Sequence, residues 1–215
     1  MKKNFIWIAT FFLVASGVAV AQLPPPPLAP GLQQWFNGWY VNQQGDTIAG
    51  HIYLSNQIDN QNEFKYSKTV QHNDEIILHA GMARSFLVKD RLYESIVMEL
   101  DRITASRFLR CVDNGNLRLY VYCELPANGV VNDGWYTRQI MPNDEKYHEV
   151  QWIIRKGSDA PVILPAGKKF IDLMTQYVGD YQQMSLKIGQ KEKGYRSGDI
   201  VAIVGEYNKW KKGNP

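Results

Sequence analysis

Apolar and polar residues alternate along much of residues 35–165, with the period expected of β-strands that bury one face. Turn-forming residues interrupt this alternation at short intervals, and almost no helical periodicity lies between them. The pattern predicts strands over residues 38–42, 47–54, 63–70, 75–78, 83–88, 92–97, 107–112, 117–124, 135–141, 148–155 and 161–164. Short strands at this spacing indicate an antiparallel sheet that curls into a barrel or a sandwich.

The clearest hairpin lies in residues 38–54, GWYVNQQGDTIAGHIYL, where two extended runs flank a polar turn. A loop of two or four residues pairs Val41 with Ile48 and places the ring of Trp39 over the bare backbone of Gly50. A three-residue loop instead pairs Trp39 with Ala49 and scatters the large apolar side chains. Because a one-residue slip moves every side chain to the other face, the apolar pattern favours the first register.

Two further expectations concern this hairpin. Asp46, in its turn, is predicted to accept hydrogen bonds from neighbouring backbone N–H groups. The hairpin itself is expected to form the edge or the first ribbon of the sheet.

The period changes after residue 165. Residues 168–178 place Phe170, Leu173, Met174 and Tyr177 on one side, which is the pattern of an amphipathic helix. A second short helix is predicted over residues 181–188, and Asp199 is expected to be the N-cap of a third. The fold class is therefore α+β, with a mostly antiparallel β domain at 35–165 and two or three C-terminal helices at 166–212 packed on the sheet.

The first residues carry a secretion signal. Lys2 and Lys3 precede an apolar run, and a small-residue stretch ends at Ala21, where cleavage of a signal peptide, residues 1–21, is expected. No cysteine for a lipid anchor follows, and no later stretch is long enough to span a bilayer. Five of the ten prolines then fall in a Pro-rich linker at 22–34, expected to be an extended spacer. The predicted location is periplasmic or extracellular.

The net charge limits the kinds of partner, and the positions of the two cysteines decide whether a disulfide is expected. Without the two signal lysines the net charge is about +1, so we expect no nucleic-acid partner. The two cysteines flank an Asn-Gly turn that predicts a hairpin, in which Cys111 lies opposite Arg118 and Cys123 opposite Ser106. The two sulfur atoms would then lie on opposite faces, too far apart for a disulfide.

The chain shows no spacing typical of an active site or a metal site. It has no Gly-x-Ser-x-Gly elbow, and neither cysteine has a histidine near it in sequence. His72, Asp74 and His79 are the only local cluster of possible metal ligands, without the spacing of a zinc motif. We therefore predict no catalytic residues, no metal and no cofactor.

Aromatic residues are the stronger signal. Flat rings on a sheet face stack on sugars or fill a groove for an apolar ligand, although they also serve in β cores. Trp35 and Trp135 each lie beside a loop and are therefore the candidates for contact with a ligand.

Three groups of residues carry a resemblance: the GDTIAG hairpin, the NGNLRLYVY run, and the C-terminal KKFIDLMTQYVGDY with GDIVAIVGEYNKW. In these features the chain resembles uncharacterised secreted proteins of Bacteroidota, which share a GDTI-x-G hairpin and a C-terminal helix containing Tyr-Asn. The resemblance implies a Gram-negative envelope setting and brings no known activity.

These observations favour a non-enzymatic secreted or periplasmic protein that acts as an interaction or binding module of the envelope. Its expected partner is an envelope protein, a glycan or a small ligand. One alternative is a glycan- or peptide-acting hydrolase whose site is assembled from distant strands. Another is a lipocalin-like carrier, which requires an open apolar cavity of several hundred Å³ inside the sheet.

Overall fold

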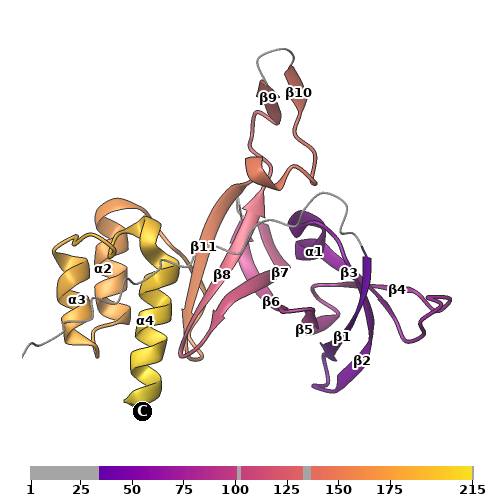
Figure 1. Ribbon diagram of the computed structural model, residues 1–215, viewed down its shortest axis with the longest axis horizontal. Coiled ribbons are helices and arrows are strands. Elements are labelled where there is room, and N and C mark those ends of the chain that lie inside the picture. The colour runs from indigo at the N-terminus through magenta and orange to yellow at the C-terminus, as the bar shows by residue number, and fades with distance from the viewer. Residues whose placement is uncertain (1–33, 101–102, 133–136, 215) are drawn as a thin grey trace, which may run out of the picture.

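A computed structural model describes residues 34–100, 103–132 and 137–214 (Figure 1). Ten strands form one antiparallel sheet in the order β12-β11-β8-β7-β6-β5-β1-β2-β3-β4. Its strands are β1 (Gln34–Asn42), β2 (Thr47–Leu54), β3 (Glu63–Ser67), β4 (Ile76–His79), β5 (Ala83–Val88), β6 (Arg91–Leu100), β7 (Ile103–Asn114), β8 (Leu117–Glu124), β11 (Glu149–Lys156) and β12 (Val162–Ile163). A projecting hairpin of β9 (Val130–Asn132) and β10 (Thr137–Gln139) stands apart from the sheet. The expected class, α+β with a mostly antiparallel sheet followed by helices, is confirmed.

The opening hairpin has the three-residue loop that the apolar pattern disfavoured. Trp39 lies opposite Ala49, so the predicted pairing of Trp39 with Gly50 is wrong. Gly45 adopts a left-handed φ of 96° and donates its N–H to the carbonyl of Asn42 at 3.1 Å, the geometry of a turn that ends in a glycine bulge. In this register the ring of Tyr66, from β3, lies where a Cβ on Gly50 would stand.

Two further expectations about this hairpin are corrected. The carboxylate of Asp46 accepts a hydrogen bond from the side-chain amide of Asn42 at 3.0 Å, and within the described residues no backbone N–H donates to it. The backbone N–H of Asp46 in turn donates to Oδ1 of Asn42 at 2.8 Å, so both residues still serve the turn. The hairpin is also not at the edge, because β1 pairs with β5 on its other side and lies in the middle of the sheet.

The Asn-Gly turn forms a hairpin, but in a different register from the predicted one. Cys111 lies opposite Tyr120 and not Arg118, because a bulge shifts the pairing between Cys111 and Asp113. As predicted, no disulfide joins Cys111 and Cys123.

Helices pack against the sheet in two places. The short helix α1 (Gln57–Asn62) lies against β3, β7 and β8, where Gln61 exchanges two hydrogen bonds with the backbone of Cys123. The C-terminal helices α2 (Gly167–Tyr177), α3 (Gln182–Gly189) and α4 (Ile200–Gly213) stand beside β8 and β11 (Figure 1). Two 3-10 turns complete the description, η1 (Glu145–Tyr147) and η2 (Ser197–Asp199). None of the described helices is long and apolar enough to cross a membrane.

Two large cores hold these parts together. The curled half around β1 to β6 is filled by aromatic rings, with Phe86 stacked on Tyr93 at 4.4 Å and on Phe64 at 4.2 Å. The second core lies between the C-terminal helices and the side chains of Leu117, Leu119 and Ile154 on the sheet. α4 also contacts the turn between β7 and β8, so the last helix of the chain is fastened to the middle of the sheet.

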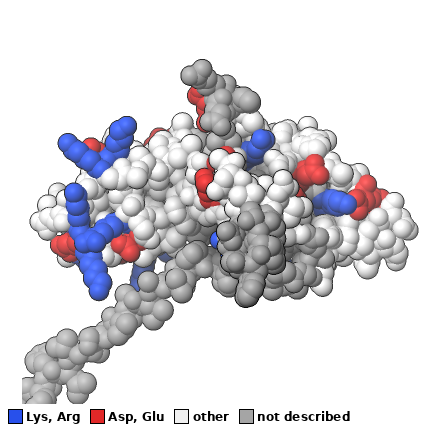
Figure 2. Space-filling model, turned by 90° about the horizontal axis from the view of Figure 1, so that it is seen from above, with Lys and Arg blue, Asp and Glu red and all other residues white. Residues whose placement is uncertain are grey.

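The two ends of the molecule differ in charge. Figure 2 shows lysines and arginines gathered over the helical end. Residues 166–214 contain nine basic and five acidic residues, whereas residues 34–165 contain thirteen basic and sixteen acidic residues.

Candidate functional site

Trp35, the first of the two predicted contact residues, belongs to a cluster of four aromatic rings on the sheet surface. Its ring stacks on His72 at 4.1 Å, nearly parallel, and meets the ring of Tyr53 edge-on at 5.6 Å. His51 approaches His72 edge-on at 5.6 Å. Trp135, the second predicted contact, lies outside the described residues.

Strand pairing and one loop build this cluster. Trp35 and Tyr53 lie directly opposite each other on β1 and β2, so both side chains are on the same face. His72 reaches them from the loop after β3, at a left-handed φ of 57°. Asp74 holds this loop by accepting hydrogen bonds from the hydroxyls of Ser67 at 2.5 Å and Thr69 at 2.8 Å. These two hydrogen bonds lower the pKa of the Asp74 carboxyl well below its usual range.

A pocket of about 300 Å³ opens beside this cluster, and Tyr53 forms part of its wall. The pocket lies where β2, α1 and β3 meet. Its lining residues are Tyr53, Ser55, Asp59, Asn60, Asn62, Glu63, Phe64 and Lys65. We call this hollow the Tyr53 pocket; it combines aromatic residues with carboxylates, side-chain amides, a lysine and a serine hydroxyl.

Local hydrogen bonds fix the polar wall of the Tyr53 pocket. Asn56 is the N-cap of α1 and accepts the backbone N–H of Asp59 at 2.9 Å, which sets the start of the helix. Oδ2 of Asp59 accepts from Ser55 at 2.8 Å and from Asn56 at 2.6 Å. Oδ1 of Asn60 accepts the backbone N–H of Ser55 at 3.3 Å, and Nδ2 of Asn60 donates to the carbonyl of Ser55 at 2.8 Å. The polar groups are therefore positioned before any ligand arrives.

Two salt bridges close the opposite side of the Tyr53 pocket. Glu63 pairs with His79 at 3.2 Å, and Lys65 pairs with Glu75 at 3.0 Å. Nζ of Lys65 also lies 5.7 Å from the centre of the Tyr53 ring.

The three residues that sequence brought together as possible metal ligands have separate partners. Asp74 binds the hydroxyls of its own loop, His79 pairs with Glu63, and His72 stacks on Trp35. Across the described residues, no group of three or more His, Cys, Asp and Glu side chains is placed to hold a metal ion.

The sequence pointed to one residue of the aromatic cluster, Trp35, and not to the pocket. It singled out Trp35, but Tyr53 is the cluster ring that lines the pocket, and Trp35 supports it from the neighbouring strand. The polar residues were missed because α1 has no apolar periodicity. The signal that sequence did offer is the N-cap pattern of Asn56 followed by Asp59 three residues later.

Comparison of the chain with protein-family models, with curated protein sequences and with solved structures gives no match. The function is therefore argued from the geometry of the chain alone.

Proposed function

We propose that this chain is a non-enzymatic binding module of the cell envelope, periplasmic or extracellular, and that it binds a glycan in the Tyr53 pocket. The observation that carries the proposal is the union of an aromatic wall with fixed carboxylate and amide groups in one pocket. The envelope setting rests on the signal peptide expected at residues 1–21 and on the Pro-rich linker after it.

Sugars demand this combination. A pyranose ring presents C–H groups on one face, which pack on the negative face of an aromatic ring, and hydroxyls around its rim. Those hydroxyls both donate and accept, so carboxylates and amides with fixed orientation bind them best. At about 300 Å³ the Tyr53 pocket is at the lower end of the size of small-molecule sites, which fits one or two sugar units.

The solvent exposure of the two pocket carboxylates, Asp59 and Glu63, favours binding over hydrolysis. A general acid that works near neutral pH needs a carboxyl in a buried, apolar setting. Here Asp59 is exposed, and the Glu63 side chain is 41% exposed and paired with His79. The carrier alternative requires an apolar cavity, whereas the core of the curled half is filled by Phe64, Phe86 and Tyr93.

Titration of the purified protein with soluble oligosaccharides tests the glycan proposal, with tryptophan fluorescence and isotope-edited NMR as readouts. Suitable probes are chitotriose, maltotriose and soluble peptidoglycan fragments. Tyr53→Ala should weaken binding about tenfold, because the stacking surface is lost. Tyr53→Phe, which keeps the ring, is the matched control and should retain most of the affinity. If no probe binds, or if both variants bind as the natural chain does, the glycan proposal is wrong.

Fractionation of cells that produce the chain tests its location separately. We expect the protein in the periplasm or the medium, shortened at its N-terminus by the signal peptide. Recovery of the uncleaved chain from the cytosol would contradict the envelope setting.

A further inference from the structure

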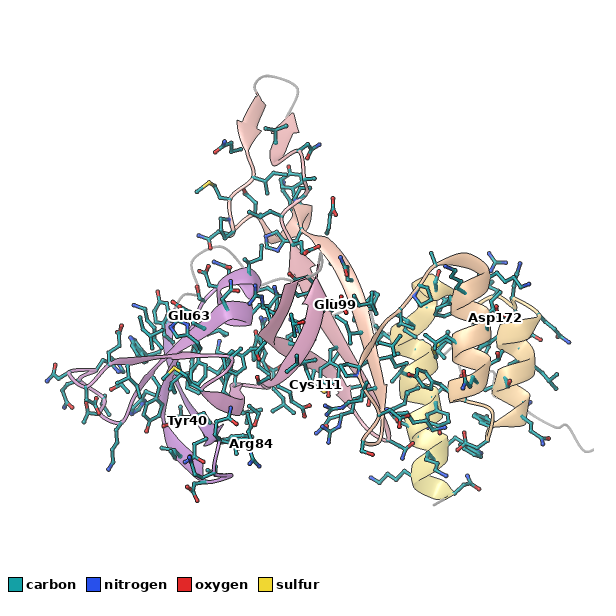
Figure 3. All side chains as sticks on the ribbon, turned by 180° about the vertical axis from the view of Figure 1, so that it is seen from behind. Tyr40, Glu63, Arg84, Glu99, Cys111 and Asp172 are labelled. Carbon is teal, nitrogen blue, oxygen red and sulfur yellow. The ribbon has the colours of Figure 1, made fainter. Side chains whose placement is uncertain are left out.

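A second and larger hollow lies between the curled half of the sheet and its central strands. It has a volume of about 580 Å³, within the usual range of small-ligand sites. Figure 3 shows Arg84 at this boundary, near the central strands that carry Cys111. The lining residues are Val41, Gln43, Ala80, Gly81, Arg84, Ser85, Glu94, Ser95, Val97, Ser106 and Arg155. We call this hollow the arginine cleft.

Uneven strand lengths create the arginine cleft. β6 pairs with β5 only as far as Glu94, and beyond that point it pairs with β7 alone. The loop before β5 approaches the side of β6 that β5 leaves open. The hydroxyl of Ser95 on β6 donates to the carbonyl of Ala80 in this loop. Arg84 ties the β1–β2 turn to the same wall by donating to the carbonyl of Gln43 at 2.6 Å. These hydrogen bonds hold the loop before β5 and the β1–β2 turn, which form one wall of the arginine cleft, against the strands.

A charged network forms the other wall. The Glu94 side chain, 15% exposed, accepts hydrogen bonds from Arg118 at 2.8 and 3.0 Å and from Arg155 at 2.9 Å. The hydroxyl of Tyr120 donates to the same carboxylate at 2.6 Å. One carboxylate thus faces two guanidinium groups and one phenol.

The network around Glu94 carries more positive than negative charge and contains a hydrogen-bond donor without an acceptor within the described residues. Glu94 balances only one of the two arginines it binds. Nε of Arg155 is buried and has no hydrogen-bond partner in the described part of the chain. Arg84 adds a second guanidinium from the opposite wall, and Ser85 and Ser106 add hydroxyls. An unpaired buried N–H group favours a ligand that supplies an acceptor.

The neighbouring groups are unsuited to covalent chemistry. Burial, and then the charge of Glu94, raise the pKa of the Cys111 thiol to about 12, so almost none of it is thiolate at neutral pH. Burial and the hydrogen bond to Glu94 likewise raise the pKa of the Tyr120 phenol above its usual range. Tyr120 instead supports the network, through its hydrogen bond to Glu94 and its ring 5.5 Å from the Arg155 guanidinium, so the arginine cleft is suited to binding.

We propose that the arginine cleft is a second binding site, for a small ligand that carries a carboxylate or phosphate group, held between Arg155 and Arg84. Planar guanidinium groups bind such oxyanions through paired hydrogen bonds. The Tyr53 pocket does not share this chemistry, because Asp59 and Glu63 give it two carboxylates. The two sites are therefore selective for different ligands and stand or fall separately.

Calorimetric titration of the full chain with succinate and with inorganic phosphate tests the proposal. Sodium chloride at matched ionic strength is the reference, because a general salt effect must be separated from site binding. Succinate and phosphate together distinguish a carboxylate site from a phosphate site. Arg155→Gln should weaken binding about ten- to a hundredfold, the size expected for loss of a charged hydrogen bond.

Arg196→Gln is the matched control, because Arg196 is an exposed arginine just before η2 that belongs neither to the Glu94 network nor to the lining of the arginine cleft. It should retain binding within about threefold. Arg84→Gln removes the guanidinium of the opposite wall and should also weaken binding, which keeps the test decisive if Arg155→Gln does not fold. The proposal is overturned if neither anion binds above the chloride reference, if Arg84→Gln binds as the natural chain does, or if Arg196→Gln loses as much affinity as Arg155→Gln.

Discussion

Replacement of Asn208 by alanine is expected to be among the most destabilising polar substitutions in this chain. Asn208 belongs to α4, but its side chain reaches the turn between β7 and β8. Oδ1 accepts the backbone N–H of Leu117 at 2.8 Å, and Nδ2 donates to the carbonyl of Leu117 at 2.8 Å and to the carboxylate of Asp113 at 2.6 Å. Leu117 itself is fully buried, so its N–H and carbonyl have little access to water after the substitution.

The magnitude follows from these three contacts. Each hydrogen bond to Leu117 is worth about 1 kcal/mol, and the one to the Asp113 carboxylate about 2 kcal/mol. Alanine is the better helix former by about 0.7 kcal/mol, which offsets part of the loss. We expect the free energy of unfolding to fall by about 3 kcal/mol, which for a chain of this length lowers Tm by about 6–12 °C.

Urea unfolding followed by tryptophan fluorescence and by far-UV circular dichroism measures this loss. Asn214→Ala is the control, because that exposed amide at the end of the same helix donates only to the carbonyl of Trp210. It should change stability by less than about 0.5 kcal/mol. If Asn208→Ala changes stability no more than this control, the fastening of α4 to the β7–β8 turn is not an important source of stability.

Three further predictions concern the same protein. Gly115→Ala should destabilise the natural chain and cost less in Asn208→Ala, because the added Cβ would overlap the Asn208 side chain; a double-mutant cycle in urea measures the coupling. Burial would raise the pKa of Asp180, but the hydrogen bonds from Tyr207 and the charge of Lys156 outweigh it and lower the pKa. A lowered pKa gives stability that is present at neutral pH and lost as the pH falls below about 4, so Asp180→Asn should narrow the gap between urea midpoints at pH 7 and pH 3. In a Cys123→Ala background, the half-buried Cys111 should react with Ellman's reagent at pH 8 more slowly in the native chain than in the urea-unfolded chain, because its raised pKa leaves little thiolate; equal rates would contradict this prediction.

Much of the fold could be predicted from the sequence because apolar alternation reports directly on burial. Residues 83–88 form the strand as predicted, and the helix predicted at 168–178 is found at Gly167–Tyr177. Asp199 occupies the N-cap position of α4 as predicted, but its side chain makes no capping hydrogen bond to that helix and accepts the backbone N–H of Arg196 at 3.0 Å. Helix α1 could not be predicted, because its stability comes from the Asn56 cap and from Gln61 on the backbone of Cys123, and neither leaves a periodic pattern.

Register was harder to predict than the strands, because turn geometry decides it. Gly45 permits a left-handed backbone, which closes a three-residue loop and overrides the apolar match of Val41 with Ile48. The pairing of β1 with β5, some forty residues apart, has no local signal at all. The candidate sites were hard to predict for the same reason. Trp35 could be singled out by its aromatic character, but only the tertiary fold places Arg84 and Arg155 around one cleft.

The bond between Asn208 and Leu117 joins residues that are 91 positions apart, and this separation has a consequence for biosynthesis. The β7–β8 turn is synthesised before α4, so the N–H and the carbonyl of Leu117 gain their partner only once residue 208 has been made. A chain that stops before residue 208 leaves these two buried groups without the partner that Asn208 provides. Such a shortened chain should therefore be degraded faster in cells than the natural chain.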